Sequence, residues 1–231
     1  MEFAELPALR MAYRTWGPRH GRPVLLLPGG AADGSTWATV AARLADDGLR
    51  SYAPDPRGFG ASDRTGPYGL AVARDDVRAL CDVLALDRPV LVGHSSGAVV
   101  AALFAEAHPD RVAALVLEEP PPPVPLGLRL PARPPGPLGY DWAAREAVVA
   151  DLNRPDPDGW ARFGRITAPT LVVAGGPASH LPQADLARMA ARLPAGDLVT
   201  IDAGHAVHAS HPDEFVAAVR AFLRSRWVNG A

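Results

Sequence analysis

Lysine is absent from this chain, and cysteine occurs only once among its 231 residues. All 23 basic residues are arginine, so Schiff-base chemistry and a phosphate-binding loop with its lysine are both excluded. The single cysteine, Cys81, excludes an internal disulfide. Its helical spacing from Val77, Leu80 and Leu84 predicts a small buried hydrophobic side chain rather than a reactive thiol.

Long apolar runs are also missing. No stretch approaches the roughly 18 apolar residues that a membrane-spanning helix needs, and the start lacks the basic and apolar segments of a signal peptide. We therefore expect a cytoplasmic protein with no membrane partner. The net charge of −2 argues against nucleic acid as a partner. The sequence does not indicate the oligomeric state.

The remaining composition is that of a folded domain. Hydrophobic residues make up 48% of the chain and charged residues 21%, which predicts one globular domain rather than a disordered chain. Abundant alanine, glycine and proline beside arginine alone favours a bacterial source with a GC-rich genome.

Short aliphatic runs alternate with segments of helical periodicity. The aliphatic runs are typical of strands in a parallel sheet that is covered on both faces, and they span residues 22–28, 88–94, 111–119, 168–176 and 197–205. The periodic segments predict helices over residues 36–48, 69–86, 96–109, 183–194 and 212–227. Residues 9–17 predict one or two opening strands. This alternation indicates an α/β fold with right-handed crossovers.

One proline-rich stretch interrupts the alternation. Residues 120–137 contain nine prolines, and proline lacks the amide donor that a helix or an inner strand requires. A polyproline ligand for another protein is one interpretation. We favour an insertion over the carboxyl edge of the sheet, which continues through a helix over residues 140–155 and through residues 156–166.

The segment Gly93-His94-Ser95-Ser96-Gly97 matches the pattern G-x-S-x-G between a predicted strand and a predicted helix. An abrupt strand-to-helix turn strains its central residue and leaves no room for flanking side chains, which explains both glycines. The turn lifts the Ser95 hydroxyl above the sheet and predicts a nucleophile. Ser96 is the rival, but it lies off the centre of the motif. The Ser96 N–H at the helix start is expected to stabilise a developing oxyanion.

A histidine that follows the last predicted strand supplies the expected base. His205 lies at the same sheet edge as Ser95. His208 and His211 compete for this role, and the three together resemble a metal-binding spacing. That spacing would need a helix, whereas Gly204 and Pro212 favour a loop before residue 212. We therefore expect no metal, and we expect His208 and His211 to pack or to cap.

The loop after the first aliphatic run contains Pro28-Gly29-Gly30-Ala31. Its glycines allow the backbone to approach a ligand closely, so the Gly30 N–H is expected to be the second oxyanion donor. A plain glycine turn is the simpler interpretation. The substrate pocket is expected to include Gly29, Ala31, His94, Trp142 and Trp160.

With these segments the chain resembles the α/β-hydrolase fold superfamily over essentially its whole length. Residues 55–62, DPRGFGAS, are similar to a loop of that superfamily, and Trp37 and the histidine segment fit it as well. The resemblance implies a mostly parallel eight-stranded sheet with helices on both faces. It implies a core of residues 1–119 and 166–231, a short cap over 120–165, and no cofactor.

Two departures from the superfamily pattern stand out. Pro28-Gly29 replaces the usual His-Gly before the oxyanion donor, and residues 175–180 contain no acid where an aspartate is usual. The chain order serine, acid, histidine places the acid between Ser95 and His205. Some members carry it after the strand that ends in Glu118 and Glu119, and by their register we favour Glu119. Glu118 remains the alternative, as do three aspartates, Asp141, Asp151 and Asp202.

The expected activity is hydrolysis of a carboxylic ester, lactone or thioester through an acyl-enzyme on Ser95. A small-molecule acyl substrate is the expected partner. A serine at the turn argues against epoxide hydrolase or dehalogenase chemistry, because those enzymes use a carboxylate there. The same fold also serves lyases, cyclases, acyltransferases and slow ligand sensors, so these remain alternatives.

Overall fold

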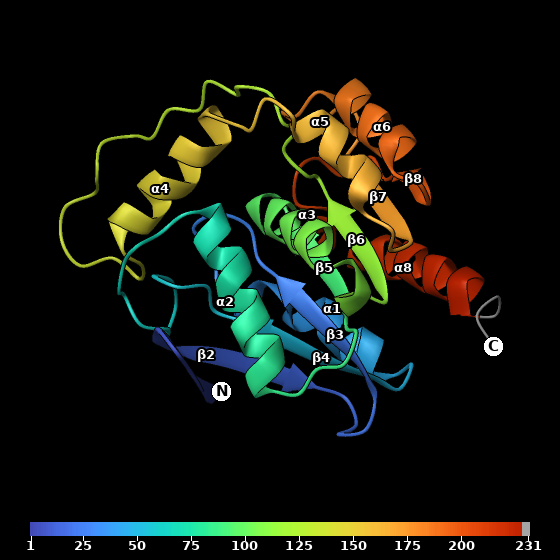
Figure 1. The fold of residues 1–231 in the computed structure, drawn as a ribbon, viewed down its shortest axis with the longest axis horizontal. Helices are drawn as coiled ribbons and strands as arrows, with labels where there is room; N and C mark the ends of the chain where they lie inside the picture. Colours follow the sequence, from blue (N-terminus) through green and yellow to red (C-terminus); the bar gives the residue numbers. More distant parts are fainter. Residues whose placement is uncertain (228–231) are drawn as a thin grey trace.

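Eight strands form one sheet within residues 1–227, the part of the chain that the computed structural model describes (Figure 1). The strands are β1 (Glu2–Leu6), β2 (Leu9–Trp16), β3 (Arg22–Leu27), β4 (Leu49–Pro54), β5 (Val90–His94), β6 (Ala114–Glu118), β7 (Thr170–Ala174) and β8 (Gly196–Thr200). Their order across the sheet is β1-β2-β4-β3-β5-β6-β7-β8. The pairings of β2 with β1 and β4 are antiparallel, and the other neighbouring pairs are parallel. The predicted α/β fold with a mostly parallel sheet is confirmed.

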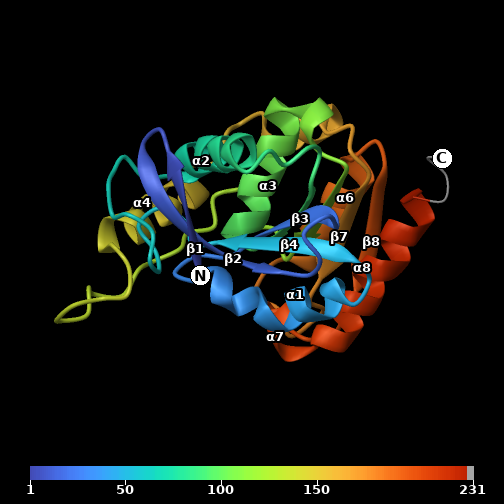
Figure 2. The same ribbon diagram turned by 90° about the horizontal axis from the view of Figure 1, so that it is seen from below.

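Helices cover both faces of this sheet (Figure 2). One layer contains α2 (Leu70–Val83), α3 (Ser96–Ala107) and α6 (Gln183–Arg192), and the other contains α1 (Ala38–Ala45) and α8 (Pro212–Trp227). Shorter helical turns connect these elements: η1 (Gly34–Trp37), η2 (Pro109–Arg111) and α7 (Val207–Ser210).

Successive residues of the central strands enter two separate hydrophobic cores. Leu91 and Leu115 pack with Phe104 in the core beneath α2, α3 and α6. Val92 and Val116 pack in the opposite core beneath α1 and α8. Because both faces are buried, these strands read as continuous aliphatic runs, which is why the sequence revealed them.

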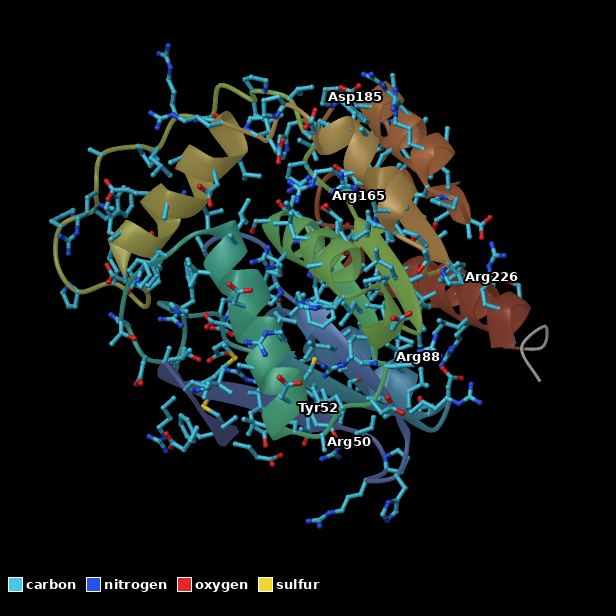
Figure 3. All side chains as sticks on the ribbon, viewed as in Figure 1. Arg50, Tyr52, Arg88, Arg165, Asp185 and Arg226 are labelled. Carbon is cyan, nitrogen blue, oxygen red and sulfur yellow. The ribbon has the colours of Figure 1, made fainter. Side chains whose placement is uncertain are left out.

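The strand β4 was missed in the sequence. Its residues LRSYAP do not form an aliphatic run, because Arg50 and Tyr52 alternate with the buried Ser51. The tertiary structure accommodates them at the edge of the parallel region. Nη1 of Arg50 donates to the carbonyl of Gly17 at 2.7 Å, and its guanidinium lies 5.6 Å from the centre of the Tyr52 ring (Figure 3).

The segment between β6 and β7 leaves the sheet at its carboxyl edge and arches outward (Figure 1). Residues 120–137 contain neither helix nor strand, as their prolines predicted. The rest of the segment forms α4 (Trp142–Asn153), α5 (Gly159–Arg162) and η3 (Phe163–Arg165). The division into a core of 1–119 and 166–231 and a cap of 120–165 stays a prediction, and residues 228–231 of that core lie outside the described residues.

Two carboxylates attach α4 to the rest of the molecule. The Tyr68 hydroxyl donates to Asp141 at 2.7 Å, and the N–H of Leu70 at the start of α2 donates to Asp151 at 2.7 Å. Asp141 also caps α4 by accepting from the N–H of Ala143 at 3.0 Å. Both aspartates therefore have structural partners away from His205.

Among the described helices, none is both long enough and apolar enough to cross a membrane.

Candidate active site

A sharp turn carries the chain from β5 through Ser95 into α3. Ser95 has φ 52° and ψ −121°, a strained conformation for a residue with a side chain. A Cβ atom at Gly93 would lie 2.6 Å from the Ala98 backbone, and one at Gly97 would lie 2.8 Å from the carbonyl carbon of Leu27. Only glycine fits on either side of the turn, which leaves Ser95 partly exposed at the carboxyl edge of the sheet.

Glu119 follows β6, the strand beside β5, and its side chain reaches His205. The carboxylate is fully buried, and its Oε2 lies 3.1 Å from Nδ1 of His205. Glu119 has φ 46°, a left-handed conformation that is uncommon for a residue other than glycine. Its own N–H donates to the carbonyl of Val173 at 2.8 Å, which holds this conformation against the neighbouring strand.

The loop that lacks an acid supplies hydrogen-bond donors instead. The Gly175 N–H donates to Oε1 of Glu119 at 2.5 Å, Nε2 of Gln183 donates to the same oxygen at 3.2 Å, and the Ser179 hydroxyl donates to Oε2. Burial raises the pKa of Glu119, but hydrogen bonds from His205, Ser179, Gly175 and Gln183 together lower this pKa below its usual value. The carboxylate is therefore ionised at neutral pH.

Sequence reasoning did not find Ser179 and Gln183 as partners of the acid. The one signal was the position of Ser179 in the loop where an aspartate is usual, whereas Gln183 is the first residue of α6. The same loop places the exposed His180 against His205, with 4.3 Å between the two ring centres. Burial, and then the nearby His205, lower the pKa of His180, so its ring is neutral at neutral pH.

Glu118 points away from His205 and binds a different histidine. Its fully buried carboxylate accepts from the backbone N–H of His208 at 2.8 Å, and Nδ1 of His208 lies 3.0 Å from the same oxygen. The His208 ring stacks on Trp37 with 4.2 Å between ring centres. Glu118 is the last residue of β6, and Glu119 follows it with a left-handed backbone, so the two side chains reach different histidines.

A loop was expected before residue 212, and this expectation is wrong for four residues, which form one helical turn. Val207–Ser210 form the short helix α7, with the N–H of His211 bonded to the carbonyl of Val207 at 2.8 Å. The buried Glu118 carboxylate stabilises this turn, because it accepts the otherwise unpaired N–H of His208.

The three histidines of this segment have separate surroundings. His205 contacts Glu119, His208 is buried against Glu118, and Nδ1 of His211 lies 3.1 Å from the Ser210 hydroxyl. They do not converge on a common point.

His94, the residue before Ser95, connects the two histidine pairs. Its Nε2–H donates to the carbonyl of His205 at 2.8 Å, and its ring centre lies 4.8 Å from those of both His205 and His208. Burial lowers the pKa of His94 to about 4, so the ring is neutral at neutral pH. One ligand atom each of His94, Glu118 and His208 lies within 4.8 Å of the others. The hydrogen bonds just described already occupy Nε2 of His94 and Nδ1 of His208.

The turn and the base are close without being hydrogen-bonded. Within residues 1–227, no hydrogen bond joins the Ser95 hydroxyl to His205, although His94 fixes the His205 backbone beside the turn. Catalytic hydrogen bonds often tighten only when the substrate binds.

The two expected oxyanion donors lie side by side. A Cβ atom at Gly30 would lie 3.6 Å from Oγ of Ser96, and one at Gly29 would lie 3.3 Å from Cβ of Ser95. As the first residue of α3, Ser96 has no helical acceptor for its N–H. Gly29, Gly30 and Ser96 all line one cavity of about 70 Å³.

The structure places the other expected pocket residues elsewhere. Ala31 is exposed, with φ 62°. Trp142 stacks on Tyr140, and the Trp160 ring packs against Arg188, whose guanidinium lies 4.0 Å from the ring centre. Neither tryptophan lines this cavity or the larger one described below, because their rings have partners on the segment itself or on α6.

The remaining acid candidate also lies away from the base. Asp202 is exposed, and its Oδ1 would lie 2.9 Å from a Cβ atom at Gly176. Of the expected carboxylates, Glu119 is the one that contacts His205.

Comparison with known proteins agrees with this fold. The sequence model of the alpha/beta hydrolase fold matches residues 22–162, which is more than half of the chain. The chain belongs to the α/β-hydrolase fold family. A non-heme chloroperoxidase from Streptomyces lividans is 39% identical over 115 residues, which cover 48% of this chain and 41% of the relative. A serine hydrolase-like protein from Danio rerio is 36% identical over 107 residues, which cover 45% and 32%. The matches thus span less than half the length of these relatives.

Solved structures extend the likeness over nearly the whole α/β-hydrolase chain. A hydrolase from Pseudomonas aeruginosa PA01 superposes with a TM-score of 0.82 and 25% identity, covering 96% of this chain and 97% of its own. The enol-lactonase from Burkholderia xenovorans LB400 superposes with a TM-score of 0.80 over 96% and 100% of the two chains. At 21% identity, the latter match establishes the shared fold alone.

Proposed function

We propose that this protein is a serine hydrolase that cleaves a carboxylic ester, lactone or thioester through an acyl-enzyme on Ser95. The observation that carries the proposal is the hydrogen bond between buried Glu119 and His205, with the strained Ser95 turn held beside it. This constellation is defined by geometry and roles rather than by the chain position of the acid.

In the first half of the reaction, Ser95 attacks the substrate carbonyl. An ionised carboxylate can accept hydrogen bonds but cannot donate them, so Glu119 keeps the proton of His205 on Nδ1. Nε2 of His205 is then free to accept the serine proton. The N–H groups of Gly30 and Ser96 stabilise the tetrahedral oxyanion. As the carbonyl re-forms, the leaving alcohol or thiol takes the proton from Nε2, and the acyl group remains on Ser95.

In the second half, His205 takes a proton from water, which attacks the acyl-enzyme. The oxyanion occupies the same two N–H groups, and the bond to Ser95 Oγ breaks as that oxygen recovers the proton from His205. The carboxylic acid then leaves. Glu119 stays ionised throughout and stabilises the imidazolium that forms in each half.

Covalent labelling tests the nucleophile. A fluorophosphonate probe should label the wild type and the Ser96→Ala variant, but it should not label Ser95→Ala. Labelling of Ser95→Ala at wild-type rate would contradict the assignment, and peptide mass spectrometry identifies the modified residue.

Turnover separates the hydrolase from other proteins of the same fold. Multiple turnovers are expected on a panel of short p-nitrophenyl esters, lactones and thioesters. A single burst equal to the enzyme concentration would favour a ligand sensor. Labelling of Ser95 without turnover of any member of the panel would favour a lyase, a cyclase or an acyltransferase.

A further inference from the structure

Two cavities of unequal size lie on either side of the nucleophile helix α3. The small cavity, of about 70 Å³, is lined by the expected oxyanion donors Gly30 and Ser96 and also by Phe59 and Val148. The large cavity, of about 290 Å³, lies against Val99 and the neighbouring α3 side chains. Ser95 stands at the start of the helix that separates them.

The large cavity is lined by residues on both sides of the two glutamates in the chain. Its walls include Leu117, which precedes the two glutamates, and the four prolines Pro120–Pro123, which follow Glu119 directly. Phe163 and Ile166 close it from the segment that leads into β7. These apolar walls favour an apolar occupant, because burying apolar surface away from water favours binding.

The charged groups of the large cavity leave no attraction for an anionic ligand. Three carboxylates line it, those of Glu106, Asp151 and Asp156, against the guanidinium groups of Arg154 and Arg162. Nε of Arg162 bonds Glu106 at 2.6 Å, its Nη1 bonds Asp156, and Asp151 already accepts a backbone N–H. The lining therefore carries a net charge of −1, which disfavours a ligand that ends in a carboxylate.

The volumes set the size of the two substituents. The large cavity, of about 290 Å³, has about four times the volume of the small one, of about 70 Å³, so the two substituents differ in size. The geometry points to an asymmetric ester or thioester as substrate, with a long, uncharged apolar arm in the large cavity and a short arm on the oxyanion side. This inference rests on the proposed function of Ser95.

Alkyl esters of matched size test the inference and show which arm is the long one. Ethyl octanoate carries the long arm on the acyl side, and octyl acetate carries it on the alcohol side. In pH-stat assays, at least one of the two should have a kcat/KM about tenfold or more above that of ethyl acetate. Octyl octanoate has two long arms, so its kcat/KM should be about tenfold lower than that of the better substrate among ethyl octanoate and octyl acetate. Equal kcat/KM for all four esters would overturn the inference.

Three valine-to-phenylalanine variants locate the long arm. Val99→Phe fills the large cavity, Val148→Phe fills the small one, and Val83→Phe changes a residue that is 49% exposed and lines neither. Val99→Phe should lower kcat/KM about tenfold for whichever of ethyl octanoate and octyl acetate the wild type prefers. It should leave kcat/KM for ethyl acetate within twofold of the wild-type value. Val83→Phe should change neither. Ala102→Leu, on the same wall as Val99, serves if Val99→Phe does not fold, as judged by circular dichroism.

A binding measurement keeps the cavity separate from the chemistry. In the Ser95→Ala background, calorimetric titration with 1-octanol should detect binding that Val99→Phe weakens at least fivefold and Val83→Phe does not. Binding of this kind without ester turnover would retain the large cavity and reject the proposed hydrolase. Ester turnover that is insensitive to Val99→Phe and Ala102→Leu would reject the large cavity and retain the hydrolase.

Discussion

Oε2 of Glu119 and Nδ1 of His205 lie 3.1 Å apart, although 86 positions separate the two residues in the chain. The carboxylate is fully buried and accepts three further hydrogen bonds, two from the loop after β7 and one from Gln183 at the start of α6. A carboxylate that follows β6 thus contacts this histidine, and the loop after β7, where an aspartate is usual in this fold family, supplies hydrogen-bond donors to it.

Replacing Glu119 with glutamine should lower kcat by about 10²–10⁴ and leave KM nearly unchanged, because the orienting carboxylate acts mainly in the transition state. Steady-state kinetics on the best ester of the panel measure the loss. Retention of near wild-type turnover would mean that His205 works without this acid.

Glu118→Gln should cost less than tenfold in kcat, because this carboxylate binds His208 rather than His205. Stability should fall by about 1–3 kcal/mol in urea unfolding, because the change disrupts the buried hydrogen bonds of this side chain to the N–H and Nδ1 of His208. A loss of turnover larger than that of Glu119→Gln would show that Glu118 is the acid.

An aspartate returned to the loop should partly rescue the loss of Glu119. The Ser179 hydroxyl already contacts Oε2 of Glu119, so a carboxylate at position 179 lies within reach of His205. The double variant Glu119→Ala, Ser179→Asp should exceed Glu119→Ala in kcat by about tenfold, within the range that such a carboxylate is worth. The matched double variant with Ser179→Asn should show no gain; an equal gain from asparagine would point to packing instead of charge.

Stability should fall as the pH drops from 6.5 towards 4, because of His94. Burial lowers its folded-state pKa to about 4 from 6.5, so the unfolded chain binds a proton in this window that the folded chain does not. The contribution is complete above pH 6.5 and is lost as the pH falls, with an upper bound of about 3 kcal/mol.

Urea unfolding of the wild type and of His94→Gln at pH 7.5 and pH 5 measures this contribution. The variant should show a smaller difference between the two pH values, since glutamine does not titrate. Glu119, whose pKa is lowered, contributes stability that is lost only below the carboxylate's unfolded pKa, and so at a lower pH than His94. Identical pH dependence in both proteins would exclude His94 as the cause.

Elements whose signal is contiguous in the chain were predictable from sequence. The turn at Ser95 was predictable from its two glycines, the aliphatic strand before it and the apolar helix after it. His205 was predictable from its place after the last strand. The strand β4 lacked such a signal because Arg50, Ser51 and Tyr52 interrupt it, and only long-range contacts make it a strand. Local periodicity indicates which face of a helix or strand is buried. It does not indicate which distant residue will form a hydrogen bond with a polar side chain.

The choice between Glu118 and Glu119 could not be made from spacing and chain order. Spacing and chain order by themselves left Glu118 and Glu119 as neighbours with equal chemistry. The register of β6 against β5, which pairs His94 with Glu118, and the left-handed backbone of Glu119 turned the two carboxylates to different histidines. The hydrogen-bond shell from Gly175, Ser179 and Gln183, and the two cavities beside α3, likewise exist only where segments far apart in the chain meet. Their formation depends on three-dimensional packing, and no local pattern encodes it.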